Sequence, residues 1–276
     1  MVDITRGTSG RTAAEIARAV AIEAGRVMLD RFNRSKEISY KGPGNIVTDV
    51  DIEVEQLIFS SLRAEYPDIT FVGEESAGEI RADEGYAWIV DPLDGTRNYA
   101  AGIPFYSTVI GLAKDGDILV GVNYDPVRED MFEAEKGEGA FLNCLPVKVS
   151  EKTALRECVI GVDLGYNSPG AAKALDLLRG LWPNMQTSRI MGSSALGLSY
   201  AASGRTDLYF HHSLSPWDMV AGILMVREAG GVITDRNGKP MTLYGDGLIA
   251  SSKTLHAEFL QRTERSSWRE PTQHLV

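Results

Sequence analysis

The sequence of 276 residues predicts a layered α+β fold, in which helices pack against mixed β-sheets. Three features predict it. The first quarter of the chain contains two segments with helical apolar spacing, the middle contains short β-rich segments joined by turns, and strand and helix patterns alternate beyond about residue 150. Because the chain exceeds the roughly 100–150 residues of a common single domain, we expect two parts, an N-terminal α+β part at 1–150 and a C-terminal α/β part at 151–276.

Two amphipathic helices follow a polar lead-in at residues 1–10. Thr12 and Glu15 have the spacing of a capping box, and apolar residues at helical spacing continue to about Phe32. A segment containing Gly and Pro, residues 41–45, then interrupts the chain. A second helix is expected from Thr48 until just before Pro67, because the residue that precedes a proline disfavours the helical conformation.

The rest of the chain predicts strands first and then an alternation of strands and helices. We expect strands at 69–73, 86–90, 106–113, 118–124 and 131–134. Turn-forming residues at 114–116 and 136–139 indicate that several of these strands are antiparallel neighbours. Further strands are expected at 159–162, 207–210, 232–234 and 248–250, and helices at 168–181, 193–202 and 216–228. The polar residues from Arg265 onward are expected to form a tail.

The charge balance limits the classes of partner. The chain has 28 Lys and Arg against 38 Asp and Glu, a formal net charge of −10, so it lacks the basic surface that nucleic-acid backbones require. A hydrophobic fraction of 43% supports a substantial core and excludes intrinsic disorder. Two cysteines, Cys144 and Cys158, cannot build a secreted disulfide scaffold, and no apolar run is long enough to span a membrane. We therefore expect a cytoplasmic protein with no membrane partner.

The segment from Trp88 to Thr96 is the densest in groups that can carry chemistry. An apolar run ends in Asp91, Pro92 turns the chain, and Asp94 follows two residues later. Because an isolated ionised carboxylate is costly inside a protein, two of them at a strand end indicate a cation, and oxygen ligands favour Mg²⁺. Gly95 permits a close backbone approach beside the Thr96 hydroxyl. The alternative is an ordinary turn with an Asp at a helix N-cap.

Two other acidic positions raise the same question. Glu74 follows the β-rich run 69–73. Ligand sites in layered α/β folds often lie at strand ends, although a Glu in this position is also common in a solvated loop. Ser215 and Pro216 suit the first positions of a helix, so Asp218 falls in its first turn, where an acid also complements the helix dipole. Trp217 indicates a half-buried setting, in which an unpaired acid is unfavourable. The acids at 49 and 51 open the second helix in the same way.

Five segments, taken together, resemble the inositol monophosphatase family of Mg²⁺-dependent, lithium-sensitive phosphatases. They are Gly73–Ser76, Trp88–Asn98, Gly192–Ala195, Trp217–Gly222 and Glu228–Gly231. The Trp88–Asn98 segment is the most specific, and the resemblance extends from about residue 11 to 260. It implies the five-layered αβαβα sandwich of the sugar-phosphatase fold, with most metal ligands in the N-terminal part and the C-terminal part completing the site.

The resemblance also implies roles for individual residues. One Mg²⁺ would be held by Glu74, Asp91 and the Leu93 carbonyl, and a second by Asp91, Asp94 and Asp218. Asp51 would lie behind these ligands and contact a third, weaker ion through water. Glu74 and Thr96 would orient and activate the attacking water. The substrate would contact Asp94, Gly95, Thr96, Gly192, Ser193, Ser194, His211 and Asp218.

The implied function is Mg²⁺-dependent hydrolysis of a small phosphate monoester by a homodimer, with inositol monophosphate as the first candidate. Two ions about 3.5–4 Å apart suit an in-line displacement. His211 stands where the family usually has a Glu that contacts sugar hydroxyls, unless His211 is a surface residue and a neighbour takes that role. Fructose 1,6-bisphosphate, histidinol phosphate and a nucleotide 3′-phosphate are therefore alternative substrates. A regulatory protein that binds the RNA machinery and retains the fold is the alternative of another class.

Overall fold

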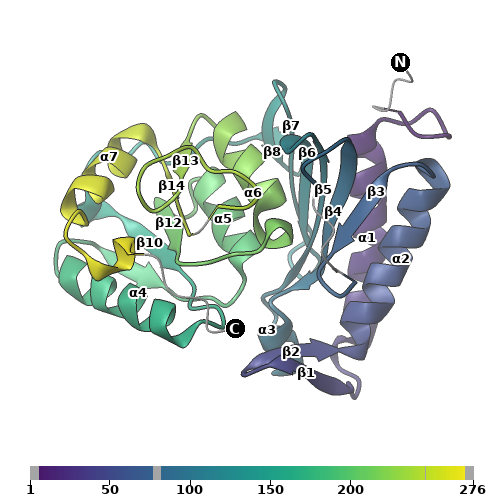
Figure 1. Cartoon of the computed structure of the whole chain (residues 1–276), viewed down its shortest axis with the longest axis horizontal. Coiled ribbons are helices and arrows are strands. Elements are labelled where there is room, and N and C mark those ends of the chain that lie inside the picture. The colour runs from purple at the N-terminus through teal and green to yellow at the C-terminus, as the bar shows by residue number, and fades with distance from the viewer. Residues whose placement is uncertain (1–5, 77–81, 246, 271–276) are drawn as a thin grey trace.

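The computed structural model describes residues 6–76, 82–245 and 247–270. Its elements form five layers, with two helices, a seven-stranded sheet, two helices, a five-stranded sheet and two helices in succession (Figure 1). The αβαβα sandwich expected from the sequence is confirmed. All strands of the larger sheet come from residues 70–146 and all strands of the smaller sheet from residues 159–251.

The first layer consists of α1 (Ala13–Phe32) and α2 (Asp49–Glu65), which lie close to their expected positions. The Glu15 N–H donates to Thr12 Oγ1 at 3.2 Å and the Thr12 N–H donates to Glu15 Oε2 at 2.8 Å, so the predicted capping box forms. One face of each helix packs on the larger sheet, through residues such as Ile16 and Ile58 that are fully buried.

A hairpin of β1 (Ile38–Gly42) and β2 (Asn45–Thr48) occupies the segment that the sequence predicts only as an interruption. The sequence analysis missed both strands. The physical reason is that four of the five β1 residues are exposed, so this strand lacks the alternation of apolar and polar residues that marks a half-buried strand. The hairpin lies beside α3 (Thr96–Ala100) at one end of the larger sheet (Figure 1).

The larger sheet has the order β3-β4-β5-β6-β7-β8-β9, with β3 parallel to β4 and the other neighbours antiparallel. Its strands are β3 (Thr70–Gly73), β4 (Tyr86–Asp94), β5 (Ser107–Lys114), β6 (Asp117–Asp125), β7 (Asp130–Glu135), β8 (Gly139–Leu142) and β9 (Leu145–Pro146). The turn at 114–116 joins the expected strands β5 and β6 as antiparallel neighbours, and the turn at 136–139 joins β7 to β8, a strand that was not expected from the sequence. Strand β4 extends four residues beyond its expected end, which carries it to Asp94.

The smaller sheet has the order β11-β10-β12-β14-β13 and mixes parallel and antiparallel pairs. Its strands are β10 (Val159–Val162), β11 (Thr187–Arg189), β12 (Leu208–His211), β13 (Val232–Thr234) and β14 (Leu248–Ser251). Strand β11 was not expected from the sequence, because its three residues are polar and partly exposed.

The middle layer consists of α5 (Ser194–Ala202) and α6 (Pro216–Glu228), which lie between the two sheets. Helix α6 belongs to the C-terminal part of the chain but packs directly on the larger sheet. A Cβ on Gly121 would lie 2.7 Å from the Cα of Ala221, so the sheet admits α6 at this point only because position 121 lacks a side chain. The first turn of α6 is thereby held against the end of β4.

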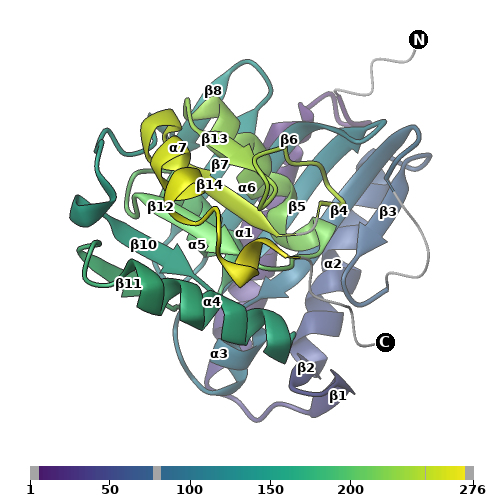
Figure 2. The ribbon, with the colours of Figure 1, turned by 60° about the vertical axis from the view of Figure 1, so that its left-hand side comes forward.

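The last layer consists of α4 (Ser168–Leu181) and α7 (Lys253–Arg262), which cover the outer face of the smaller sheet (Figure 2). Short 3₁₀ turns, η1 (Leu155–Glu157) and η2 (Ser267–Arg269), flank them. The expected tail from Arg265 is wrong for residues 265–270, because Trp268 is fully buried against Phe210 and Phe259. Residues 271–276 lie outside the described part.

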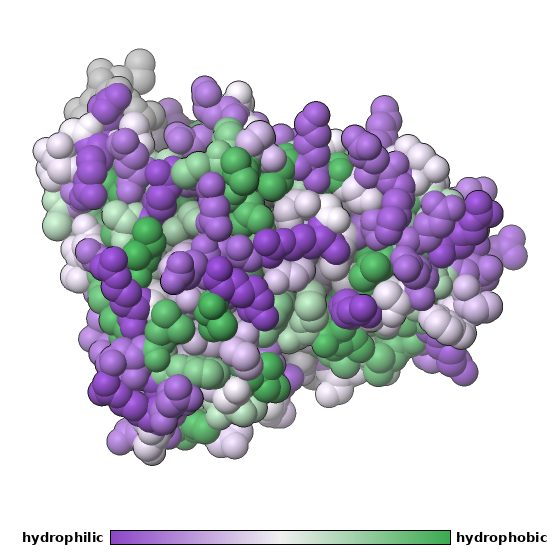
Figure 3. Space-filling model, turned by 180° about the vertical axis from the view of Figure 1, so that it is seen from behind, coloured by the Kyte–Doolittle hydropathy of each residue, from purple (hydrophilic) through white to green (hydrophobic). Residues whose placement is uncertain are grey.

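The surface and the helices give two further observations. On the face in Figure 3, polar and apolar side chains alternate in small groups. Among the described residues, no helix is both long enough and apolar enough to cross a membrane.

Candidate metal and phosphate site

Asp91 and Asp94 end the buried strand β4, and a local irregularity turns both toward one place. In the pairing with β5, Asp91 lies opposite Val109 and Asp94 lies opposite Ser107, so β4 contains one residue more than its partner here. Such a bulge bends the strand. The Leu93 N–H donates to Asp91 Oδ1 at 3.0 Å, which fixes this carboxylate beside the turn.

Asp218 reaches the same place from the first turn of α6. Ser215 is the N-cap and Pro216 the first helical residue, as the sequence predicts. The Ser215 N–H donates to Asp218 Oδ2 at 2.7 Å. Each of Asp91, Asp94 and Asp218 offers one carboxylate oxygen, and these three oxygens all lie within 4.8 Å of one another. We call these three residues the acidic centre. Tertiary packing brings them together although 124 residues separate the last two.

No described cation forms an ion pair with the three carboxylates of the acidic centre, although the charge of Lys41 opposes the increase in the pKa of Asp218. Burial, followed by the charge of nearby Glu74, raises the pKa of Asp91 and of Asp218 well above the ordinary value. Burial also raises the pKa of Asp94 to about 6, although hydrogen bonds from Ser193 and Ala195 oppose the increase. Oδ2 of Asp91 is buried without a hydrogen-bond partner in the described part of the chain. A buried oxygen without a donor, in a group of like charges, suits a divalent cation.

Asp94 also joins the two parts of the chain. The Ser193 hydroxyl donates to its carboxylate, and the backbone N–H groups of Ser194 and Ala195 lie 3.2 and 3.1 Å from its oxygens. Asp94 therefore caps the N-terminus of α5, which is a favourable position for an anion. Two of the residues that the resemblance assigns to the substrate, Ser193 and Ser194, consequently lie directly beside the acidic centre.

The backbone at Gly192 is held from both sides by residues that the sequence analysis did not select. Asp163, at the end of β10, accepts hydrogen bonds from the N–H groups of Met191 at 2.8 Å and Gly192 at 2.6 Å. The Asn98 side-chain amide donates to the Met191 carbonyl at 2.7 Å. Two signals could have found them, because Asn98 closes the Trp88–Asn98 segment and Asp163 is an acid directly after an apolar strand.

Gly95 and Thr96 start the short helix α3 beside the acidic centre. Gly95 has a φ of +91°, and a Cβ there would lie 3.0 Å from the Phe105 carbonyl oxygen, so glycine is required. The Thr96 hydroxyl lies 2.9 Å from Asp51 Oδ1 and 2.9 Å from the Leu93 carbonyl oxygen. Asp51 is fully buried, and this burial raises its pKa to about 6. The structure therefore brings together Asp51, Leu93 and Thr96, as expected.

Glu74 lies outside the group of three oxygens. The Lys41 ammonium lies 2.7 Å from Glu74 Oε1 and 2.9 Å from Glu75 Oε1, so the β1–β2 hairpin supplies a cation to this pair. Glu74 is still close enough that its charge raises the pKa of Asp91, Asp94 and Asp218. The sequence analysis did not foresee that Lys41 would contact Glu74.

His211 is fully buried at the end of β12. Its Nδ1 accepts a hydrogen bond from the Ser213 N–H at 3.1 Å, and its ring stacks on His212 with the centroids 4.7 Å apart. Burial lowers the pKa of His211 well below the ordinary value, so the ring is neutral. Its Nε2 is buried without a hydrogen-bond partner in the described residues. The alternative of a surface histidine is therefore wrong, because the side chain has no exposed area.

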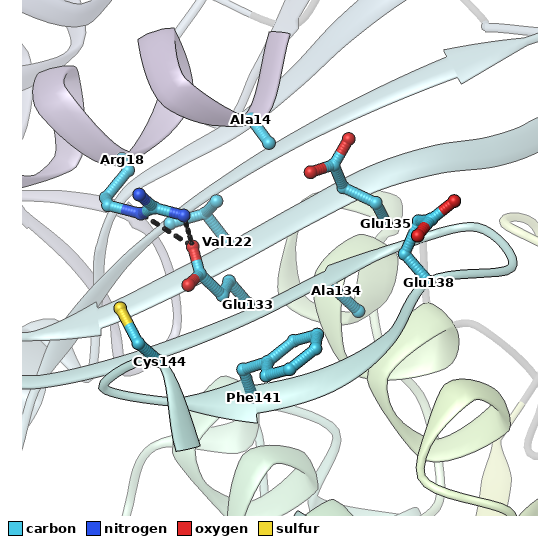
Figure 4. A pocket seen from close by; sticks show the side chains of 9 residues that line it. All are labelled: Ala14, Arg18, Val122, Glu133, Ala134, Glu135, Glu138, Phe141 and Cys144. Carbon is cyan, nitrogen blue, oxygen red and sulfur yellow. Dashed lines mark hydrogen bonds and ion pairs between the residues drawn. The ribbon is translucent and has the colours of Figure 1, made fainter. Parts of the chain in front are cut away.

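A separate cavity of about 220 Å³ lies between α1 and the strands β7 and β8 (Figure 4). Arg18 from α1 points to Glu133 from β7 across it, and the two side chains form an ion pair at 2.6 Å. The cavity shares no lining residue with the acidic centre.

Comparisons with known proteins agree with this geometry. The family model described as "Inositol monophosphatase family" matches residues 11–267. An inositol-1-monophosphatase of Mesorhizobium japonicum is 34% identical, with 89% of this chain and 93% of that protein covered. A protein of Haemophilus influenzae named Nus factor SuhB is 36% identical, with 90% and 94% covered.

Solved structures are similar over the same extent. The extragenic suppressor protein SuhB of Bartonella henselae has a TM-score of 0.85 and 36% identity, with 91% of this chain and 98% of that chain covered. An IMPase of Thermotoga maritima has a TM-score of 0.84 and 29% identity, with 91% and 96% covered. On the family match, the relatives and the five-layered fold, this chain belongs to the inositol monophosphatase family.

Proposed function

We propose that the protein is a Mg²⁺-dependent phosphatase that hydrolyses small phosphate monoesters, with inositol monophosphate as the first candidate substrate. The observation that carries the proposal is the acidic centre, in which three carboxylates converge and one oxygen of Asp91 is buried without a donor. Membership of the inositol monophosphatase family supports phosphatase chemistry at this place.

The donor atoms favour magnesium. Asp91, Asp94 and Asp218 offer oxygen atoms alone, and hard cations such as Mg²⁺ select oxygen ligands. The Leu93 carbonyl and Glu74 complete the proposed ligand set, with two or three ions per site. When bound, the ions neutralise the charge of the phosphate and make water a nucleophile at neutral pH. Lys41 lies 2.7 Å from Glu74 Oε1, so an ion would compete with Lys41 for Oε1 or bind at Oε2.

The protein's own groups orient the attacking water. The Thr96 hydroxyl has a single hydrogen, and both Asp51 and the Leu93 carbonyl lie within hydrogen-bonding distance of it. With that hydrogen engaged, the remaining lone pair of the hydroxyl can accept a hydrogen bond from water. Glu74 is the neighbouring carboxylate that can take the proton from the same water. This arrangement gives Thr96 an orienting role and Asp51 the role of fixing Thr96.

The phosphate and leaving group have separate proposed contacts. The backbone N–H groups of Gly95 and Thr96 would receive the phosphate at the start of α3, where backbone N–H groups favour an anion. Gly192, Ser193 and Ser194 would contact the remainder of the substrate next to Asp94. His211 is fully buried, so a contact with the substrate in place of the Glu usual in the family would require a local rearrangement. The ring would then donate through Nε2, because Nδ1 already accepts from the Ser213 N–H.

A substrate panel tests the proposal. Released phosphate is measured with inositol 1-phosphate, fructose 1,6-bisphosphate, histidinol phosphate and a nucleotide 3′-phosphate, each with MgCl₂ and with EDTA. Structures of IMPase-II of Staphylococcus aureus, 27% identical to this chain, are described with inositol monophosphate and with 2′AMP bound, so the panel includes 2′AMP. We expect Mg²⁺-dependent turnover that lithium weakens. Equal turnover in EDTA contradicts the metal requirement. A preference for another ester identifies that ester, rather than inositol monophosphate, as the substrate.

A regulatory role is the second candidate, because relatives at 34% and 36% identity are named Nus factor SuhB. We propose that such a role is separate from catalysis. Binding of an inactive Asp91→Asn variant to purified transcription elongation complexes tests the role, and absence of binding by wild-type protein excludes it.

We also propose that the protein forms a homodimer in the cytoplasm. Light scattering tests the dimer, with an expected mass of about twice the 30.1 kDa of the chain.

A further inference from the structure

Arg97 connects segments from the two parts of the chain beside the acidic centre. It is an exposed residue of α3. Its Nε donates to the Gly44 carbonyl in the β1–β2 hairpin at 2.8 Å, and its Nη1 donates to the Gly165 carbonyl beyond β10 at 3.2 Å. Its guanidinium carbon also lies 4.4 Å from the centre of the Tyr166 ring. One side chain thus holds two backbone carbonyls and one aromatic ring.

The hairpin depends on few contacts to keep its position. Its base is fixed by Asp49, whose N–H donates to the Glu37 carbonyl at 3.1 Å and whose carboxylate accepts from the Glu37 N–H at 3.0 Å. Toward its tip the residues are exposed, and the Tyr40 side chain is 73% exposed. Among the described residues, the ion pairs and hydrogen bonds of the tip with other elements are those of Lys41 with the two Glu residues and of Gly44 with Arg97, while β2 also packs against α2 and α3.

Gly44 is shaped to receive the Arg97 side chain. Its φ is +70°, and a Cβ at this position would lie 2.6 Å from Arg97 Nη2. The guanidinium therefore lies where any other residue at 44 would place its Cβ. A planar fork of N–H donors can hold two carbonyls and stack on an aromatic ring at once, whereas the ammonium of a lysine is a point charge that lacks this geometry.

The other end of the contact lies near the start of α3, beside the acidic centre. Arg97 directly follows Gly95 and Thr96, and its guanidinium carbon lies 4.4 Å from the centre of the ring of Tyr166, a residue that is 46% exposed. Asn167 next to it is the N-cap of α4 and accepts a hydrogen bond from the Gly170 N–H at 2.9 Å. The segment 163–167 is therefore anchored on its own helix and presents Tyr166 beside the site.

We propose that Arg97 is a positioning residue that ties the tip of the β1–β2 hairpin to segment 163–167, and so holds Lys41 and Tyr166 at the mouth of the acidic centre. The tie is a property of the fold. Its effect on turnover rests on the proposed phosphatase function. Without Arg97, the ion pairs of Lys41 would be the remaining polar contacts of the hairpin tip with other described elements, and an ion at Glu74 would weaken one of the two.

The tie is tested first on metal-free protein, by hydrogen–deuterium exchange. Arg97→Ala is expected to raise backbone exchange in residues 38–48 and 163–167 by about tenfold, which corresponds to one lost charge-assisted contact. Exchange in α1 and α2 should not change. Arg97→Lys should restore only part of the protection, because it retains the charge but not the fork. Arg179→Ala is the matched control, since Arg179 is an exposed arginine of α4 paired only locally with Asp176.

Kinetics supply the second readout. We expect Arg97→Ala to raise KM about tenfold while kcat changes less than about threefold, because the chemistry-bearing groups stay in place. If Arg97→Ala fails to fold, Arg97→Lys carries both measurements. Unchanged exchange in the hairpin overturns the tie, whereas a fall in kcat without a change in KM overturns its proposed effect on substrate binding. Wild-type protein that hydrolyses none of the esters refutes the proposed function instead, and the exchange experiment still decides the tie.

Discussion

Two acidic groups lie side by side in this protein, and they are compensated in opposite ways. The acidic centre of Asp91, Asp94 and Asp218 is built from β4 and α6, and no cation among the described residues is in ion-pair contact with it, although the charge of Lys41 reaches Asp218. The neighbouring pair, Glu74 and Glu75, receives the Lys41 ammonium from the β1–β2 hairpin. Burial of like charges without a cation is unfavourable. The difference indicates that the acidic centre is arranged for a cation from solution, whereas the Glu pair already has one.

The comparison extends to the individual oxygens. Asp94 uses both oxygens to accept hydrogen bonds at the N-terminus of α5. Asp91 leaves Oδ2 without a partner in the described residues. The two aspartates, three positions apart, therefore have different roles. Asp94 is a candidate metal ligand and also accepts the hydrogen bonds that hold the start of α5, whereas Oδ2 of Asp91 accepts no hydrogen bond from the described residues. Substitutions that keep shape and remove charge should separate these duties.

The largest effect is expected for Asp91→Asn. Loss of this ligand should reduce phosphate release by about a thousandfold, because stabilisation of the transition-state charge is worth several kcal/mol. The same variant should raise Tm in EDTA by about 3 °C, since it removes a buried, repelled charge. Phosphate release and thermal unfolding are measured on one preparation. Undiminished turnover contradicts the proposed ligand role, and a lower Tm contradicts the view that the charge is uncompensated.

Asp94→Asn is expected to differ in the sign of its stability effect. An amide cannot accept hydrogen bonds from all three donors at the start of α5, so one donor is left unpaired, at a cost of about 1–2 kcal/mol. Tm in EDTA should therefore fall by about 2–6 °C. Turnover should fall as well. Equal Tm values for the Asp94 and Asp91 variants would remove the distinction between them.

Acidification should weaken Mg²⁺ binding. The pKa of Asp94 is about 6 in the folded, metal-free protein and 3.8 ordinarily, so between these values the folded state keeps a proton that the unfolded chain has lost. The contribution of Asp94 to stability therefore falls as pH rises through this window, and bound Mg²⁺ must displace the proton. We expect affinity to fall about tenfold from pH 7 to pH 5. Calorimetry in buffers of different ionisation enthalpy measures the released protons, and affinity independent of pH contradicts the expectation.

The smallest effect is expected for Lys41→Gln, which makes the Glu pair resemble the acidic centre. Because the Lys41 side chain is partly exposed, at 28%, its ion pairs should contribute only about 0–1 kcal/mol. Tm in EDTA should fall by about 1–2 °C, and the increase in Tm on adding MgCl₂ should become larger because Glu74 is released. The matched control is Lys136→Gln, which breaks an exposed surface pair with Asp117. A smaller response to MgCl₂ than in wild type would contradict the proposed competition.

Local sequence signals predicted much of the fold. The capping box at Thr12, the helix at Ser168–Leu181 and the helix at Pro216–Glu228 appear where they were expected, because caps, prolines and apolar periodicity act within a few residues. The strands β1 and β11 were missed, since their exposed or polar residues give no such signal, and β2, β8 and β9 were missed because two to four residues are too few for an alternation to stand out. Helices α3 and α7 were not expected from the apolar pattern either. The predicted tail failed at Trp268, whose burial depends on aromatic rings from β12 and α7.

The sequence by itself determined most of the long helices and buried strands, the family resemblance and the chemical identity of the candidate ligands, because these depend on residue types at short spacings. Three features were decided only by the tertiary structure. They are the convergence of three carboxylates, the ion pair between Lys41 and Glu74, and the contacts of Arg97 with both parts of the chain. The tertiary structure also decided that His211 is neutral. Those properties arise from burial and from contacts between distant segments, and neither is encoded in the spacing of neighbouring residues.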